Sequence, residues 1–285
     1  MLSALRLAVG VTAGLLVVQV VGGALSGSLA LLADAAHVFT DLLGLLLSYT
    51  AARLADRAGD SRRTYGLYRV EILAAVVNGS LLIVLSLWIL WEAFERARTP
   101  RPLEAGWMLA AASVALAGNL LSLTALRRHG GGSLNVRAAT LEVLADTFGS
   151  AGVLLAAAVI FPTGLLILDP ILSAILAVAM LPRTVKLLKE ALHILLEGTP
   201  PGLDHSAIAT TIAQVPGVVS VHDLHVWCLT SGVPVLTAHV VAGDGGSCDD
   251  LLDRVAARLL EDFGIDHATI QIEHGKRVLR ENARF

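Results

Sequence analysis

Two pairs of side chains that can bind metal are each spaced four residues apart. One pair is His37 and Asp41, and the other is Glu142 and Asp146. On a helix, this spacing places both members of a pair on one face, one turn apart. An imidazole with three carboxylates suits a divalent transition metal, with zinc favoured at tetrahedral nitrogen and oxygen sites. Oxygen-richer sites move the preference toward manganese or ferrous iron.

A further carboxylate, Asp34, lies almost one turn before His37. The spacing leaves three roles open for Asp34: a metal ligand, a proton carrier or a structural hydrogen-bonding partner. The sequence has no HExxH motif, which a zinc protease within the membrane would need for its metal-bound water and general base. We therefore expect no catalytic residues and no enzyme.

These ionisable residues lie in unusually apolar surroundings. The chain has 285 residues, of which 55% are hydrophobic and 16% charged, and its mean hydropathy is +0.72. Soluble domains are about 25% charged, so the composition excludes a cytosolic enzyme, a disordered chain and a nucleic-acid binder. Because a charged group at the centre of a span costs roughly 2.5–3.5 kcal/mol, the two pairs point to a function.

A membrane span needs about 20 mostly apolar residues, and six such runs occur before residue 196. Their order predicts a helical transmembrane bundle in which the second and fifth spans are antiparallel. Side by side, these two spans would bring both pairs of ligands together near the middle of the bilayer. The six runs are 5–25, 29–53, 70–94, 106–126, 138–161 and 164–187.

Lysine and arginine gather in the segments 53–69, 127–137 and 183–189, which would all lie on one side of the membrane. Because basic residues are enriched in cytoplasmic loops, both termini are predicted to be cytosolic. The predicted location is the bacterial inner or plasma membrane.

The composition changes after residue 196, where glycines and prolines between 198 and 202 form a linker. Helical spacing follows at 204–215 and 249–263, and β-branched runs occur at 218–229, 233–241 and 268–273. The order αββαβ predicts a small α+β domain. We therefore divide the chain into a six-span transport domain, 1–196, and a cytosolic metal-binding and dimerisation domain, 197–285.

Several histidines of the tail suggest another metal site, and His222, His239 and Glu273 are the candidate ligands. His222 and His239 belong to the two strands of a predicted hairpin and could be near neighbours. His222 and His225 are three apart, so a regular strand would point them to opposite faces. The alternative is that these are ordinary surface histidines.

Six motifs resemble the cation diffusion facilitator family, in the same order along nearly the whole chain. They are SLALLADAAHVFTD at 28–41, YGLYRVEILAA at 65–75, SLNVRAA at 133–139, Asp169-Pro170, HDLHVW at 222–227 and HATIQIE at 267–273. The resemblance implies a six-span homodimer that exports zinc, cobalt or cadmium in exchange for protons. It also implies a ferredoxin-like cytosolic domain that binds metal and dimerises.

His37, Asp41 and Asp146 match the family's transport site, whereas Glu142 stands where its zinc transporters usually carry histidine. The resulting prediction is proton-coupled efflux of divalent metal from the cytosol, with zinc as first choice. The alternatives are a manganese or ferrous iron exporter and a membrane-anchored metal sensor without transport. We expect no cofactor beyond the transported or regulatory metal, and a homodimer in a lipid bilayer without nucleic acid.

Overall fold

The computed structural model describes residues 2–55, 61–129, 134–243 and 247–274. The chain divides into two compact units, which are described separately. One comprises Met1–Arg57 and Ala74–Lys189, and the other Ala58–Leu73 and Glu190–Phe285.

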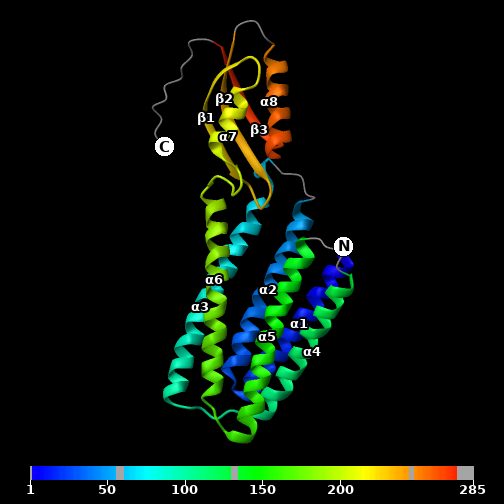
Figure 1. The fold of residues 1–285 in the computed structure, drawn as a ribbon, viewed down its shortest axis with the longest axis vertical. Helices are drawn as coiled ribbons and strands as arrows, with labels where there is room; N and C mark the ends of the chain where they lie inside the picture. The colour runs from blue at the N-terminus through cyan, green and yellow to red at the C-terminus, as the bar shows by residue number, and fades with distance from the viewer. Residues whose placement is uncertain (1, 56–60, 130–133, 244–246, 275–285) are drawn as a thin grey trace. The chain divides into compact units, whose positions relative to one another are not determined.

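Long helices overlap the six predicted apolar runs (Figure 1), and all of their residues except 68–73 and 190–195 lie in the first unit. They have 25 to 31 residues, or about 37–46 Å, which exceeds the roughly 30 Å hydrocarbon core of a bilayer. The helices are α1 (Leu2–Ser26), α2 (Leu29–Ala55), α3 (Tyr68–Arg98), α4 (Ala105–His129), α5 (Leu134–Thr163) and α6 (Leu168–Leu195).

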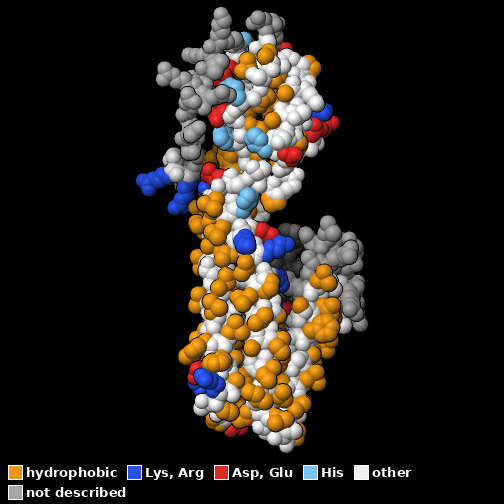
Figure 2. All heavy atoms as spheres, turned by 60° about the vertical axis from the view of Figure 1, so that its left-hand side comes forward, with side chains coloured by type: hydrophobic (Ala, Val, Ile, Leu, Met, Phe, Trp, Pro, Cys, Tyr) orange, Lys and Arg blue, Asp and Glu red, His pale blue; other side chains and the backbone are white. Residues whose placement is uncertain are grey.

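Four stretches of the described residues are long and apolar enough to cross a membrane: Tyr68–Arg98, Ala105–Leu126, Val143–Thr163 and Leu168–Leu195. Large apolar side chains on these helices point away from the unit, and Val77, Leu121 and Phe148 are each about 70% exposed. Hydrophobic side chains are spread over most of the described face of the helical unit in Figure 2, and few charged ones are visible there. Such a surface suits lipid, and it identifies a multi-pass membrane protein.

Small residues allow α1 to pack closely on α4. A side chain at Gly22 would collide with Ala111, and one at Gly118 would collide with Leu15. Close approach through glycine is typical of helix pairs in membranes, where dispersion contacts drive association. α1 also packs on α2, α4 packs on α5, and α2 contacts α5.

The second unit follows the predicted order αββαβ: α7 (His205–Ala213), β1 (Val218–Cys228), β2 (Pro234–Ala242), α8 (Cys248–Phe263) and β3 (His267–His274). Its sheet has the order β1-β2-β3, with β1 antiparallel and β3 parallel to β2. Asp204 caps α7, Ser247 caps α8, and Gly264, with a φ of 66°, ends α8.

One face of this sheet forms the core of the second unit. Leu236 and Val240 of β2 pack there against Ile208 of α7 and Val255 of α8, and all four are fully buried. Both helices therefore cover the same face, while alternate residues of β2, including His239, face the other side. The predicted fold class, a helical membrane region followed by a small α+β domain, is confirmed.

Candidate metal sites

His37 and Asp41 of α2 meet Asp146 of α5 inside the helical unit. His37 Nε2 lies 3.0 Å from Asp146 Oδ1 and 3.6 Å from Asp41 Oδ2. One ligand atom from each residue lies within 4.8 Å of the other two. Ligands on a tetrahedral zinc ion with bonds of about 2.1 Å are separated by about 3.4 Å, so this spacing fits a divalent metal.

The surroundings of Asp146 also fit a bound cation. Its Oδ1 atom is buried and accepts no hydrogen bond of good geometry among the described residues. A divalent metal between Asp146 and His37 would give this oxygen a ligand bond in addition to its contact with the imidazole. The side chain of Glu142 lies outside the described residues. Its backbone is in α5, one turn before Asp146, and its role as fourth ligand stays a prediction.

Asp34 is buried and hydrogen-bonded away from this cluster. Its Oδ2 atom accepts from Gln19 Nε2 of α1 at 2.5 Å and from Ser150 Oγ of α5 at 3.1 Å. Asn119 of α4 donates in turn to Ser150 at 3.0 Å. Asp34 thus joins four helices, which supports the structural role among the three that the sequence left open.

Sequence reasoning missed Gln19 and Ser150, the two direct partners of Asp34. Gln19 is a polar residue within the first apolar run, and it is almost fully buried. That isolated polarity was the one available signal for Gln19. Ser150 carried none, because serine is common in membrane helices.

The packing of α2 changes along its length, and the cluster lies at the transition. The described residues from Ser28 to Leu31 are completely buried, whereas Leu42 and Leu43 are half-buried and Leu46 is 39% exposed. α5 shows the same trend: none of its described residues before Ser150 is fully buried, whereas Ser150, Val153, Ala157 and Ile160 are. The cluster therefore opens toward the end of the unit where α2 ends and α5 begins.

The second unit brings together the three candidate ligands of the tail. His222 of β1 is paired with His239 of β2, and Glu273 lies on β3. The carboxylate of Glu273 lies 3.1 Å from His222 Nε2 and 3.2 Å from His239 Nδ1. One ligand atom from each of the three lies within 4.8 Å of the others, so this cluster also has the spacing for one metal ion.

Glu273 is held in its ionised form. Desolvation by burial would raise its pKa, but hydrogen bonds with His222 and Gln271 outweigh this effect. The charge of His239 acts in the same direction, so the pKa of Glu273 lies below its ordinary value. A carboxylate must be deprotonated to bind metal, so Glu273 is ready to do so at neutral pH.

The prediction that His222 and His225 face opposite sides of β1 is wrong. The register shifts between them, so His222 pairs with His239 and His225 pairs with Thr237. His239 and Thr237 share one face of β2, so both histidines of β1 lie on that face. The extra residue is a β-bulge that includes Asp223, whose φ is 52°.

Sequence reasoning also missed Asp223, which the bulge places among these histidines. Its Oδ1 atom lies 3.1 Å from His225 Nε2, and its Oδ2 atom lies 3.7 Å from His239 Nε2. Aspartate tolerates the left-handed conformation better than most residues, which fits this position in the bulge. The strand pattern gave no sign of the irregularity.

Two family profiles match the chain. The profile described as cation efflux transmembrane domain matches residues 5–196. The profile described as cation efflux protein, cytoplasmic domain, matches residues 200–275.

Curated relatives match over nearly the full chain. It is 45% identical to zinc transporter ZitB of Escherichia coli, with 94% of this chain and 86% of the relative covered. It is 41% identical to the metal cation efflux system protein CzcD of Cupriavidus metallidurans, over 94% and 85%. It is 38% identical to a cadmium, cobalt and zinc/H(+)-K(+) antiporter of Bacillus subtilis, over 91% and 85%. The chain belongs to the cation efflux family of membrane transporters.

Proposed function

We propose that this protein exports divalent transition metal from the cytosol in exchange for protons, with zinc as the first substrate and cobalt and cadmium as further ones. The observation that most directly supports this proposal is that His37 and Asp41 of α2 lie close to Asp146 of α5 inside an apolar unit. The names of the relatives, which include zinc, cadmium and cobalt transport and an H(+) antiporter, support this assignment.

Metal loads onto the cluster from the end where α2 and α5 are exposed. The basic residues of the adjoining segments make this the cytosolic end, with both termini inside and the protein in the bacterial inner or plasma membrane. Moving the metal across requires the buried ends of α2 and α5 to separate while the exposed ends close. Protons from outside compete for the same imidazole and carboxylates, because these groups bind metal only when deprotonated.

A manganese or ferrous iron exporter is the second candidate. One imidazole with two carboxylates, and Glu142 as a third, is an oxygen-rich set of ligands. A metal sensor without transport would need only the metal site of the tail. It would not need the cluster of His37, Asp41 and Asp146 within the helical unit.

The His222, His239 and Glu273 cluster is proposed as a regulatory site within a homodimer. Replacing all three with alanine should change the metal concentration at half-maximal transport while transport itself continues. A folded, membrane-inserted triple variant without transport would instead make the cluster part of the transport path.

Uptake of zinc into vesicles containing the purified full chain tests the proposed function. Asp146→Asn and His37→Ala should abolish uptake, because each removes a ligand from the shared cluster. Asp253→Asn, an exposed carboxylate on α8, is the control and should transport as wild type does. Unchanged uptake by both cluster variants would disprove the assignment of the site.

A further inference from the structure

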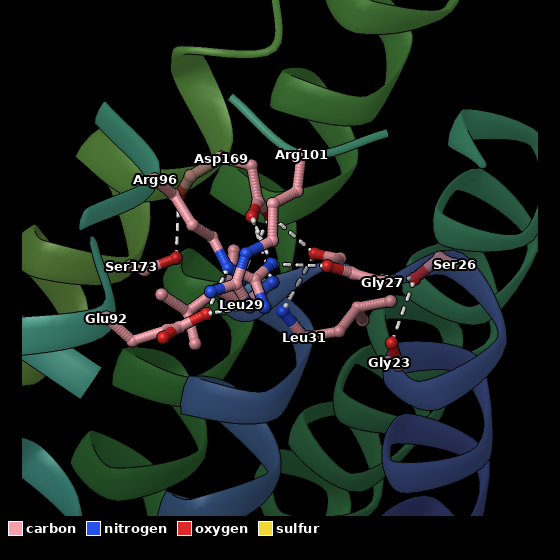
Figure 3. Close-up of polar contacts among 12 residues, drawn as sticks. Gly23, Ser26, Gly27, Leu29, Leu31, Glu92, Arg96, Arg101, Asp169 and Ser173 are labelled. Carbon is pink, nitrogen blue, oxygen red and sulfur yellow. Dashed lines mark hydrogen bonds and ion pairs between the residues drawn. The ribbon is translucent and has the colours of Figure 1, made fainter. Parts of the chain in front are cut away.

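Charged side chains gather where α2 begins, α3 ends and α6 begins (Figure 3). Asp169 of α6 is 1% exposed and Glu92 of α3 is 5% exposed. Arg96 lies 2.9 Å and Arg101 lies 2.7 Å from Glu92 Oε1. The two carboxylates and two guanidinium groups form ion pairs, so the charges of the buried carboxylates are paired.

Asp169 directs both carboxylate oxygens at the first turn of α2. Its Oδ2 atom accepts from the backbone N–H of Leu29 at 2.9 Å, and its Oδ1 atom accepts from Ala30 at 3.1 Å. Oδ1 also accepts from the hydroxyl of Ser28 at 2.6 Å, and Ser28 Oγ accepts from the N–H of Leu31 at 3.2 Å. The first N–H groups of a helix have no hydrogen-bond acceptor within that helix. In α2, Asp169 of α6 accepts hydrogen bonds from two of these groups, and Ser28 accepts one from the next.

Arg96 holds the preceding turn in place. Its guanidinium donates to the carbonyl of Gly27 at 2.5 Å and approaches Asp169 Oδ2 to 3.9 Å. The positive N-terminal end of α2 and Arg96 thus both face the carboxylate of Asp169.

Apolar packing also holds this end of α2. Leu29 packs with Ile89 of α3 and Ala177 of α6, while Leu31 packs with Ala111 of α4. The opposite half of α2 is exposed from Gly44 onward among the described side chains. The first turn, together with Asp34 five residues after Leu29, therefore holds the height and rotation of α2.

We propose that Asp169 is a positioning residue for the metal site. His37 lies eight residues after Leu29, about 12 Å along the helix axis, so the cap fixes where His37 and Asp41 meet Asp146. Because the cap comes from α6 rather than from α2 itself, it sets α2 relative to the rest of the bundle. This inference rests on the proposed function only in treating the cluster as the transported metal's site.

Asp169→Asn tests the inference, because asparagine keeps the shape but loses the charge and one acceptor. In the purified full chain, the amides of residues 29–31 should exchange hydrogen faster. Zinc affinity should fall measurably below that of wild type, because His37 and Asp41 would no longer be held in register with Asp146. The ratio of Cd²⁺ to Zn²⁺ affinity should also shift, because a displaced His37 changes the size of the site.

Arg101→Gln is the matched control, since it removes a charge from the same cluster without touching α2. It should leave exchange at 29–31 and both affinities as in wild type. A variant that merely lowers stability would reduce the amount of folded protein without altering the affinity ratio of the folded fraction.

Unchanged exchange at residues 29–31 in Asp169→Asn would overturn the proposal, and so would faster exchange with wild-type affinities. If Asp169→Asn does not fold, Ser28→Ala takes its place, because it removes the acceptor of Leu31 and a donor to Asp169. Wild-type protein that binds zinc but does not transport it would disprove the proposed function, yet these exchange and binding measurements would still decide the role of Asp169.

Discussion

The side chain at position 142 should decide which metal the proposed transport site prefers. The carboxylate gives the site a harder ligand than the histidine that zinc-type relatives usually carry. Glu142→His should therefore raise the preference for zinc over manganese, by about tenfold if one ligand bond changes the relative affinity by 1.4 kcal/mol. Competition between the two metals for transport by the full chain measures this ratio, and an unchanged ratio would place Glu142 outside the site.

Ionisation of Glu273 should make the second unit sensitive to acid. Since its pKa is lowered on folding, chiefly by the hydrogen bond with His222 working against desolvation, the ionised form stabilises the folded unit. That contribution is complete above the ordinary glutamate pKa of 4.5 and is lost as the pH falls through the lower folded value. Hydrogen exchange of β1–β3 amides in metal-free protein should show this loss, and Glu273→Gln should lack it.

Because α1 and α4 pack closely, a larger side chain at Gly22 should lower the stability of the protein. A Cβ on Gly22 would collide with the Cβ of Ala111, which has no side-chain torsion with which to move aside. Gly22→Ala should therefore destabilise the protein by about 1–3 kcal/mol, as overpacking does. Thermal unfolding in detergent measures this, and Gly10→Ala, which meets nothing within 4 Å, is the control. Equal unfolding temperatures for both variants would contradict the packing.

Elements were predictable from the sequence where a simple period or length defines them. Each long apolar run became a helix, and the αββαβ order of the tail appeared as expected. The bulge at Asp223 was not predictable, because it departs from the two-residue period on which strand faces are assigned. It moved His225 to the face of His222 and so changed the composition of that surface.

Across the whole molecule, the sequence predicted which candidate ligands lie together more readily than it predicted the residues that hold them in place. The spacing of His37 and Asp41, together with Asp146, predicted that these side chains lie close together, and they do; their role as a metal site stays a prediction. The partners of Asp34 and the cap that Asp169 provides come from helices distant in the sequence. Such contacts depend on how helices dock, which periodicity within one segment does not encode.

Exchange of metal for protons is the central claim for the whole molecule. Vesicles containing the purified full chain should be given an acidic lumen and supplied with zinc outside. Antiport predicts that zinc accumulates in the lumen in either orientation of the protein, that a protonophore abolishes accumulation, and that Asp146→Asn vesicles accumulate none. Accumulation that is equal with and without the pH difference, or equal in the Asp146→Asn vesicles, would contradict proton-coupled transport through this site.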